Sequence, residues 1–310
     1  MRVAIIDLGT NTFHLMLAEV SDNSHAIFYR ERIPVKVGER GINKGEITNE
    51  AIERALNALQ AFQVTIENNQ IEKVFGTATS AIRNAKNGTA LVKKIKDQTG
   101  IEIEIISGIR EAELIQLGAR EALDFGEEKS LVMDIGGGSI EFIIADQETT
   151  YWMKSFEIGG QRLVERFHNS DPIAASEIER LRAHFEAELT ALFEACNQFK
   201  PTVLVGCSGT FDTLSDIHCE SMGIKRDPND TEFPLPVASF QAIHADLLQQ
   251  NRAERLQIPG MIEMRVDMIV VASILVEFIL QRLALQKIRV SAYALKEGIL
   301  FNVINQIQAS

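Results

Sequence analysis

The sequence predicts an α/β protein made of two related domains. Strand-like apolar runs alternate with amphipathic, helix-like segments along both halves of the chain, which is typical of α/β architecture. The length of 310 residues allows two domains that each bury a core. A stretch near the N-terminus also matches one near the middle. We therefore expect one domain over residues 1–122 and a second over 123–310, with a final helix at about 293–308 that can pack back on the first domain.

The repeated stretch is a pair of apolar strands joined by a short turn that begins with Asp-x-Gly. The first copy reads Asp-Leu-Gly-Thr-Asn-Thr at residues 7–12, and the second reads Asp-Ile-Gly-Gly-Gly-Ser at residues 134–139. The two copies align without a gap at a constant offset of 127 (134 − 7). One such match alone would carry little weight, but two strand–turn–strand units indicate an internal duplication.

These turns contain more glycine than a hairpin needs, since a two-residue loop with one glycine would connect two strands. Without a Cβ the backbone can turn its N–H groups inward, and an anion can approach closely. We interpret both turns as phosphate-binding loops that face each other across a cleft between the domains; a pair of ordinary tight turns is the alternative. Asp134 and Glu141 lie at the edge of the second loop, where their carboxylates can hold a divalent cation.

The remaining elements alternate between strand and helix in both halves. Thr48 can cap a helix whose apolar residues keep helical spacing as far as Ile66. In the first half we expect strands at 26–30 and 34–37, a helix from 48, a strand at 73–76, a helix at 87–100, a strand at 101–106 and a helix from 108. In the second half we expect a strand at 151–158, helices ending at 168 and spanning 174–199, a strand at 202–205, a helix after 210, helices at 237–250 and 262–285, and a strand at 288–291.

Two glutamates in the helix after Ser107 are candidates for a group that activates water. Hydrolysis of a phosphoanhydride needs such a group beside charged phosphate, and a carboxylate can do this. Glu111 lies in the first helical turn, where a glutamate is usually only a favourable partner of the helix dipole. The residues alone leave Glu111 and Glu113 nearly equal.

Arg83 is a candidate phosphate clamp. It follows three hydroxyl-bearing residues at the end of a predicted strand, where ligands gather in open α/β sheets. The planar fork of its guanidinium suits phosphate oxygens, whereas a plain surface cation is the alternative reading.

A third loop, at residues 206–210, reads Gly-Cys-Ser-Gly-Thr between an apolar strand and a helix. Backbone amides and the positive end of a helix can bind a phosphate or nucleotide there, although an ordinary connecting loop has the same pattern. The two other phosphate loops favour binding. The predicted phosphate-binding residues are Asp7, Gly9, Thr10, Asn11, Thr12, Gly136, Gly137, Gly138, Ser139, Gly206, Ser208, Gly209 and Thr210.

Composition narrows the class of protein. Hydrophobic residues make up 45% and charged residues 24% of the chain, as in ordinary globular proteins. The net charge of −12 argues against a nucleic-acid partner. The longest apolar run, at 268–276, is too short to span a bilayer, and the N-terminus enters a strand directly, so we expect neither a membrane segment nor a signal peptide. Three cysteines without metal-site spacing favour a reducing, cytoplasmic location.

These motifs resemble those of the exopolyphosphatase / guanosine pentaphosphate phosphatase family, within the actin–Hsp70–sugar kinase superfamily. The resemblance covers nearly the whole chain and rests on residues 7–12, 76–83, 106–112, 134–141 and 206–210. It implies two duplicated ribonuclease-H-like domains, as in actin-like ATPases, with a cleft between them. It also implies a homodimer that releases terminal orthophosphate from polyphosphate or guanosine pentaphosphate with Mg²⁺, for which Mn²⁺ is the alternative.

The resemblance also implies roles for single residues. The family's catalytic glutamate follows Ser-Gly and precedes Ala, which selects Glu111 here. Arg83 matches the family's phosphate-contacting arginine, and Asp134 and Glu141 match its metal-side acids.

Two other functions remain open. One is an ATP-dependent small-molecule kinase of the same superfamily, which would form ADP in a substrate-dependent reaction. The other is a nucleotide or alarmone sensor, which would bind guanosine pentaphosphate without releasing phosphate.

Overall fold

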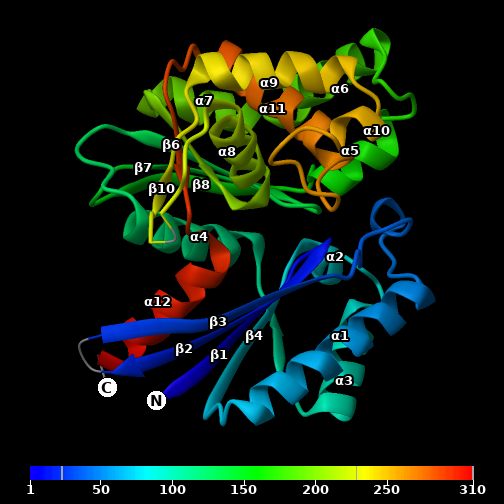
Figure 1. Cartoon of the computed structure of the whole chain (residues 1–310), viewed down its shortest axis with the longest axis vertical. Helices are drawn as coiled ribbons and strands as arrows, with labels where there is room; N and C mark the ends of the chain where they lie inside the picture. The colour runs from blue at the N-terminus through cyan, green and yellow to red at the C-terminus, as the bar shows by residue number, and fades with distance from the viewer. Residues whose placement is uncertain (22–23, 228, 309–310) are drawn as a thin grey trace. The chain divides into compact units, whose positions relative to one another are not determined.

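The computed structural model describes residues 1–21, 24–227 and 229–308 (Figure 1). The chain divides into two compact units, one made of Met1–Gly118 with Leu295–Ser310 and the other of Ala119–Ala294. Each unit contains one mixed β-sheet with helices packed against it, so the predicted α/β class is confirmed. Within the described residues, no helix is both long enough and apolar enough to cross a membrane.

The sheet of the first unit has the strand order β3-β2-β1-β4-β5. Its first three strands form an antiparallel meander, whereas β4 pairs parallel with β1, and β5 pairs parallel with β4. The carboxyl ends of these three parallel strands therefore lie at one edge of the sheet. The strands are β1 (Arg2–Leu8), β2 (Thr12–Ser21), β3 (Ser24–Pro34), β4 (Lys73–Ala78) and β5 (Ile103–Ile105).

Helices cover both faces of this sheet, which is why β1 is almost continuously apolar. Ala4 and Ile6 pack with residues of α1 and α3, whereas the alternating Val3 and Ile5 face the other side, where α12 packs on β1. As predicted, Thr48 caps α1, and its side chain accepts a hydrogen bond from an amide of the first turn at 3.2 Å. The helical segments are η1 (Ile42–Lys44), α1 (Asn49–Asn68), α2 (Ser80–Arg83), α3 (Gly88–Thr99), α4 (Gly108–Ala122) and α12 (Leu295–Gln308).

The sheet of the second unit repeats this topology and adds one strand. Read from β8, its order is β8-β7-β6-β9-β11-β10, with an antiparallel meander followed by parallel β9 and β11. The hairpins also share their register, because Asp7 pairs with His14 and Asp134 pairs with Glu141. The predicted duplication is therefore confirmed. The strands are β6 (Ser130–Ile135), β7 (Ile140–Ala145), β8 (Thr150–Phe156), β9 (Val203–Cys207), β10 (Glu232–Phe233) and β11 (Ile288–Ser291).

The helices of the second unit correct two predictions. The helix expected at 174–199 breaks at Leu189, because the Thr190 hydroxyl bonds back to a carbonyl of the preceding turn at 3.2 Å and bends the chain. The helix expected from Ile262 begins at Met268, after a run of short turns. The helices are α5 (Gly160–Phe167), α6 (Ala175–Glu188), α7 (Thr190–Phe199), α8 (Ser208–Met222), α9 (Val237–Gln249), α10 (Arg252–Arg255) and α11 (Met268–Leu283).

Candidate active site

In the first unit, Glu111 and Arg83 form a shielded ion pair. Glu111 lies in the first turn of α4, and Arg83 is the last residue of α2. Arg83 Nη1 donates to Glu111 Oε2 at 2.7 Å and to the Ile106 carbonyl oxygen at 3.2 Å. The two side chains are only 14% and 8% exposed. A charge-assisted bond of this length in a shielded position fixes the orientation of the Glu111 carboxylate.

The structure separates Glu111 from Glu113, although the residues alone left them nearly equal. Glu113 pairs with Arg110 at 2.9 Å, and these side chains are 45% and 41% exposed. Two residues on a helix differ by about 200° of rotation, so the two carboxylates point in nearly opposite directions. Glu111 faces the strand ends, and Glu113 is an ordinary surface glutamate.

The first predicted phosphate loop, at residues 9–12, is a tight turn at the end of β1. A Cβ on Gly9 would come within 2.9 Å of the Thr12 carbonyl oxygen, which explains the glycine. Thr10 and Thr12 are buried, and the carbonyls of residues 10 and 11 accept bonds of 3.1 and 2.8 Å from the segment at 36–38. Asp7 pairs across the parallel strands with Thr77. The loop, Asp7 and the hydroxyls of β4 therefore lie along the same sheet edge.

The second predicted phosphate loop, Gly136–Ser139, is held by the start of α5. The carbonyls of its three glycines all accept hydrogen bonds from residues 159–162, at 2.8–3.1 Å. A Cβ on Gly159 would come within 2.5 Å of Gly137 and Gly138, so only glycine allows this close packing. No acceptor in the described part of the chain bonds to the amides of Gly137 or Gly138. The loop thus turns its carbonyls toward α5 and leaves these two amides without an acceptor among the described residues, as backbone donors that could serve an anion would be.

The two predicted metal-side acids lie side by side in the second unit. Asp134 and Glu141 are direct cross-strand partners on β6 and β7, and both are buried. Ser208 Oγ donates to Asp134 Oδ2, and Ser155 Oγ donates to Glu141 Oε1, both at 2.6 Å. The matching position of the first hairpin holds His14, so the carboxylate pair belongs to the second unit alone.

This pair fits Mg²⁺ better than a metal held entirely by protein. Within the described residues, no group of three or more His, Cys, Asp or Glu side chains is arranged to hold a metal ion. Mg²⁺ usually takes only one or two carboxylates and fills its other positions with water and substrate phosphates. Two buried carboxylates oriented by serine hydroxyls meet that requirement.

The third predicted loop, at residues 206–210, joins β9 to α8 and contacts Asp134 on β6. Ser208 has a left-handed φ of 68°, a conformation that costs free energy and places its hydroxyl on Asp134. A Cβ on Gly206 would overlap the ring of Phe211, and a Cβ on Gly209 would overlap the guanidinium of Arg265. Arg265 therefore lies directly against the loop at the positive end of α8, where it adds to the attraction for an anion.

Sequence reasoning missed three supporting residues of the second unit. Gly159 stands in a Gly-Gly pair in the sequence, but its packing against the loop follows only from the structure. Ser155 reaches Glu141 only through the register of the neighbouring strands β7 and β8, and Arg265 reaches Gly209 from a segment far along the chain, so neither carries a local signal.

Comparison with known proteins gives consistent results along the whole chain. The model of the Ppx/GppA phosphatase family matches residues 16–306. A putative exopolyphosphatase of Haemophilus influenzae is 28% identical over all of this chain and 93% of its own length. The crystal structure of an exopolyphosphatase from Cytophaga hutchinsonii is 41% identical, with a TM-score of 0.96 over 99% of this chain and 98% of that one. The Aquifex aeolicus Ppx/GppA family member, at 24% identity, has a TM-score of 0.81 over 100% of this chain and 99% of its own and supports the fold.

Proposed function

Because this chain belongs to the Ppx/GppA phosphatase family, we propose that it is a phosphoanhydride hydrolase that releases terminal orthophosphate from inorganic polyphosphate. Relatives that match nearly its whole length are named exopolyphosphatases. The observation that carries the proposal is the shielded Glu111 carboxylate, which Arg83 holds at 2.7 Å. An oriented, shielded carboxylate beside the strand ends can act as the general base that a hydrolase needs.

In this proposal, Glu111 orients a water molecule and accepts one of its protons while the water oxygen attacks the terminal phosphorus. The bond from that phosphorus to the bridging oxygen breaks, and the shortened polyphosphate leaves with the electron pair. Arg83 positions Glu111 and contributes positive charge toward the phosphate oxygens. The amides of Gly137 and Gly138, together with the other loop residues, stabilise negative charge on the phosphate.

We also propose that Asp134 and Glu141 hold Mg²⁺, with Mn²⁺ as a substitute. When bound, the ion supplies positive charge that offsets the charge of the phosphate oxygens. Ser208 and Ser155 keep the two carboxylates oriented for this task. Calorimetry with Mg²⁺ alone provides the test: Asp134→Asn should bind the ion more weakly than the wild type. Equal affinity of the two proteins would remove Asp134 from the ligands.

The main experiment measures orthophosphate release from polyphosphates of graded length. Glu111→Gln should lower the rate by at least about 10²-fold, as expected for loss of a general base. Glu113→Gln is the matched control, two residues along the same helix, and should keep wild-type activity. Release at the wild-type rate by Glu111→Gln would show that Glu111 is not the base. ADP formation that needs a second substrate, with no orthophosphate from polyphosphate, would instead favour a kinase.

Three finer parts of the proposal need their own measurements. Guanosine pentaphosphate is proposed as a second substrate, and orthophosphate release from it in the same assay decides this. A homodimer is proposed, for which light scattering should give twice the chain mass of 34.5 kDa. A cytoplasmic location is proposed from the three free, buried cysteines, and fractionation of cells tests it.

A further inference from the structure

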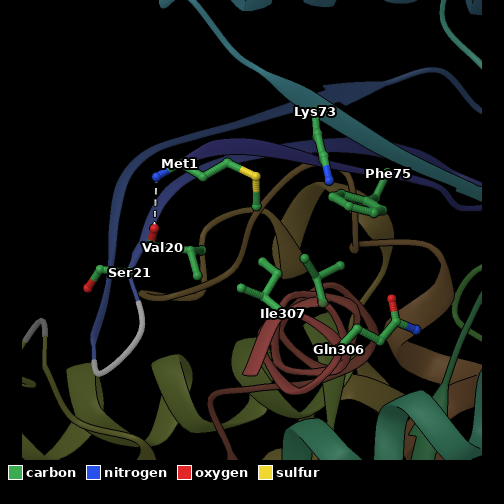
Figure 2. A pocket seen from close by; sticks show the side chains of 8 residues that line it. Met1, Val20, Ser21, Lys73, Phe75, Gln306 and Ile307 are labelled. Atoms are coloured by element: carbon green, nitrogen blue, oxygen red, sulfur yellow. Dashed lines mark hydrogen bonds between the residues drawn. The ribbon is translucent and has the colours of Figure 1, made fainter. Parts of the chain in front are cut away.

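The first unit contains a pocket far along the strands from the Glu111 end of the sheet (Figure 2). Its volume is about 700 Å³, within the range of pockets that hold small organic ligands. It lies between the sheet and the last turns of α12, and none of its residues belongs to the proposed catalytic set. The lining residues are Met1, Val20, Ser21, Lys73, Phe75, Val303, Gln306 and Ile307.

The residue spacing on each element places these side chains on the faces of β4 and α12 that line the pocket. Lys73 and Phe75 are two residues apart on β4 and share a face, while Val303 and Ile307 are four apart on α12 and share a side. The amino group of Met1 donates to the Val20 carbonyl oxygen at 2.9 Å, which ties the start of the chain to β2. Figure 2 shows the side chains of β4 and α12 directed into the same space.

The lining is mostly apolar and contains one charged side chain. Lys73 is that residue, and no acidic side chain is among the eight that line the pocket. In the part of the chain that the structure describes, no carboxylate pairs with the Lys73 amine. Lys73 is an exposed residue, so its amine is a solvated cation beside the apolar walls of the pocket. It suits a ligand with an apolar body and one negative group.

We propose that this pocket binds a small amphipathic carboxylate. The apolar body contacts Phe75, Val303 and Ile307, and burial of its surface provides most of the affinity. The carboxylate accepts a charge-assisted hydrogen bond from Lys73 Nζ, which provides the selectivity for an anion. Gln306 and Ser21 lie at the exposed rim.

Titration calorimetry with decanoate and with decanol at neutral pH tests the proposal on the full chain. The two probes share an apolar body and differ in charge, so decanoate should bind about tenfold more tightly. Lys73→Met approximately keeps the length of the side chain and removes its charge. This variant should bind decanoate only as tightly as it binds decanol. Lys94→Met, an exposed lysine on α3, is the control and should leave both affinities unchanged.

A second variant tests the location independently of charge. Gln306→Trp places a large ring from an exposed helix position into the pocket, so binding of both probes should be lost while circular dichroism shows an unchanged fold. Three results would overturn the proposal. The first is the absence of saturable decanoate binding up to about 1 mM. The second is an affinity for decanoate that is the same in Lys73→Met and in the wild type. The third is binding of both probes by Gln306→Trp with undiminished affinity.

Discussion

Removing the arginine of the Arg83–Glu111 pair should destabilise the first unit strongly. Arg83→Met leaves a glutamate carboxylate shielded from water without its guanidinium, which typically costs about 3–5 kcal/mol. Because the Arg83 side chain is 14% exposed, some water can reach the site, and we expect a value near the lower end, about 3 kcal/mol. The double variant Arg83→Met/Glu111→Gln carries no stranded charge and should lose only about 1 kcal/mol relative to wild type.

The wild type, the two single variants and the double variant form a double-mutant cycle, and the same helix supplies a matched control for it. Arg110 and Glu113 are also joined at 2.9 Å, but their side chains are 41% and 45% exposed. The coupling energy of such a surface pair is about 0–1 kcal/mol. The free energy of opening should therefore differ little between Arg110→Met and the double variant Arg110→Met/Glu113→Gln. Burial, rather than distance, is thus the quantity that the two cycles compare.

Hydrogen exchange of the α4 and β4 amides is the appropriate assay. The one tryptophan, Trp152, lies in the second unit and does not report on this helix. Exchange gives the opening free energy of these elements directly. The reasoning fails if Arg83→Met destabilises α4 no more than Arg110→Met does, or if the Arg83 and Glu111 effects simply add.

Three other predictions concern stability and reactivity. Burial, with a contribution from Arg182, lowers the pKa of His244 to about 4, so the unfolded chain alone takes up a proton between pH 6.5 and 4. The contribution of His244 to stability should therefore fall by roughly 2–3 kcal/mol as pH falls through that window. Urea unfolding followed by Trp152 fluorescence should show a correspondingly smaller loss for His244→Gln, and the rest of the pH dependence comes from groups such as His168 and His184, whose pKa burial also lowers. Gly298→Ala should cost about 1–3 kcal/mol, since its Cβ would overlap the Leu114 carbonyl where α12 meets α4; thermal unfolding measures this, and an unchanged midpoint would contradict it. Burial raises the pKa of the Cys196 thiol to about 12, so this thiol should react with Ellman's reagent only after unfolding.

Much of the fold followed from short stretches of sequence. The hairpins at Asp7 and Asp134 each carry two apolar strands and a glycine turn, and their offset predicted the duplication that the two sheets display. The cap at Thr48 and the end of α3 at Gly100 were equally local signals. The prediction of one helix over 174–199 was wrong where a side chain competes for backbone carbonyls, as the Thr190 hydroxyl does.

The sequence by itself determined the two glycine hairpins and the type of most elements, because those depend on neighbours a few residues apart. The strand expected at 34–37 was wrong, since β3 ends at Pro34 and turns follow. Only the tertiary structure decided which glutamate is shielded, since Glu111 and Glu113 differ through Arg83, 28 residues earlier in the chain. It likewise placed Ser208 on Asp134, 74 residues away, and Arg265 against Gly209. Such contacts are set by the packing of whole elements, and local periodicity carries no information about them.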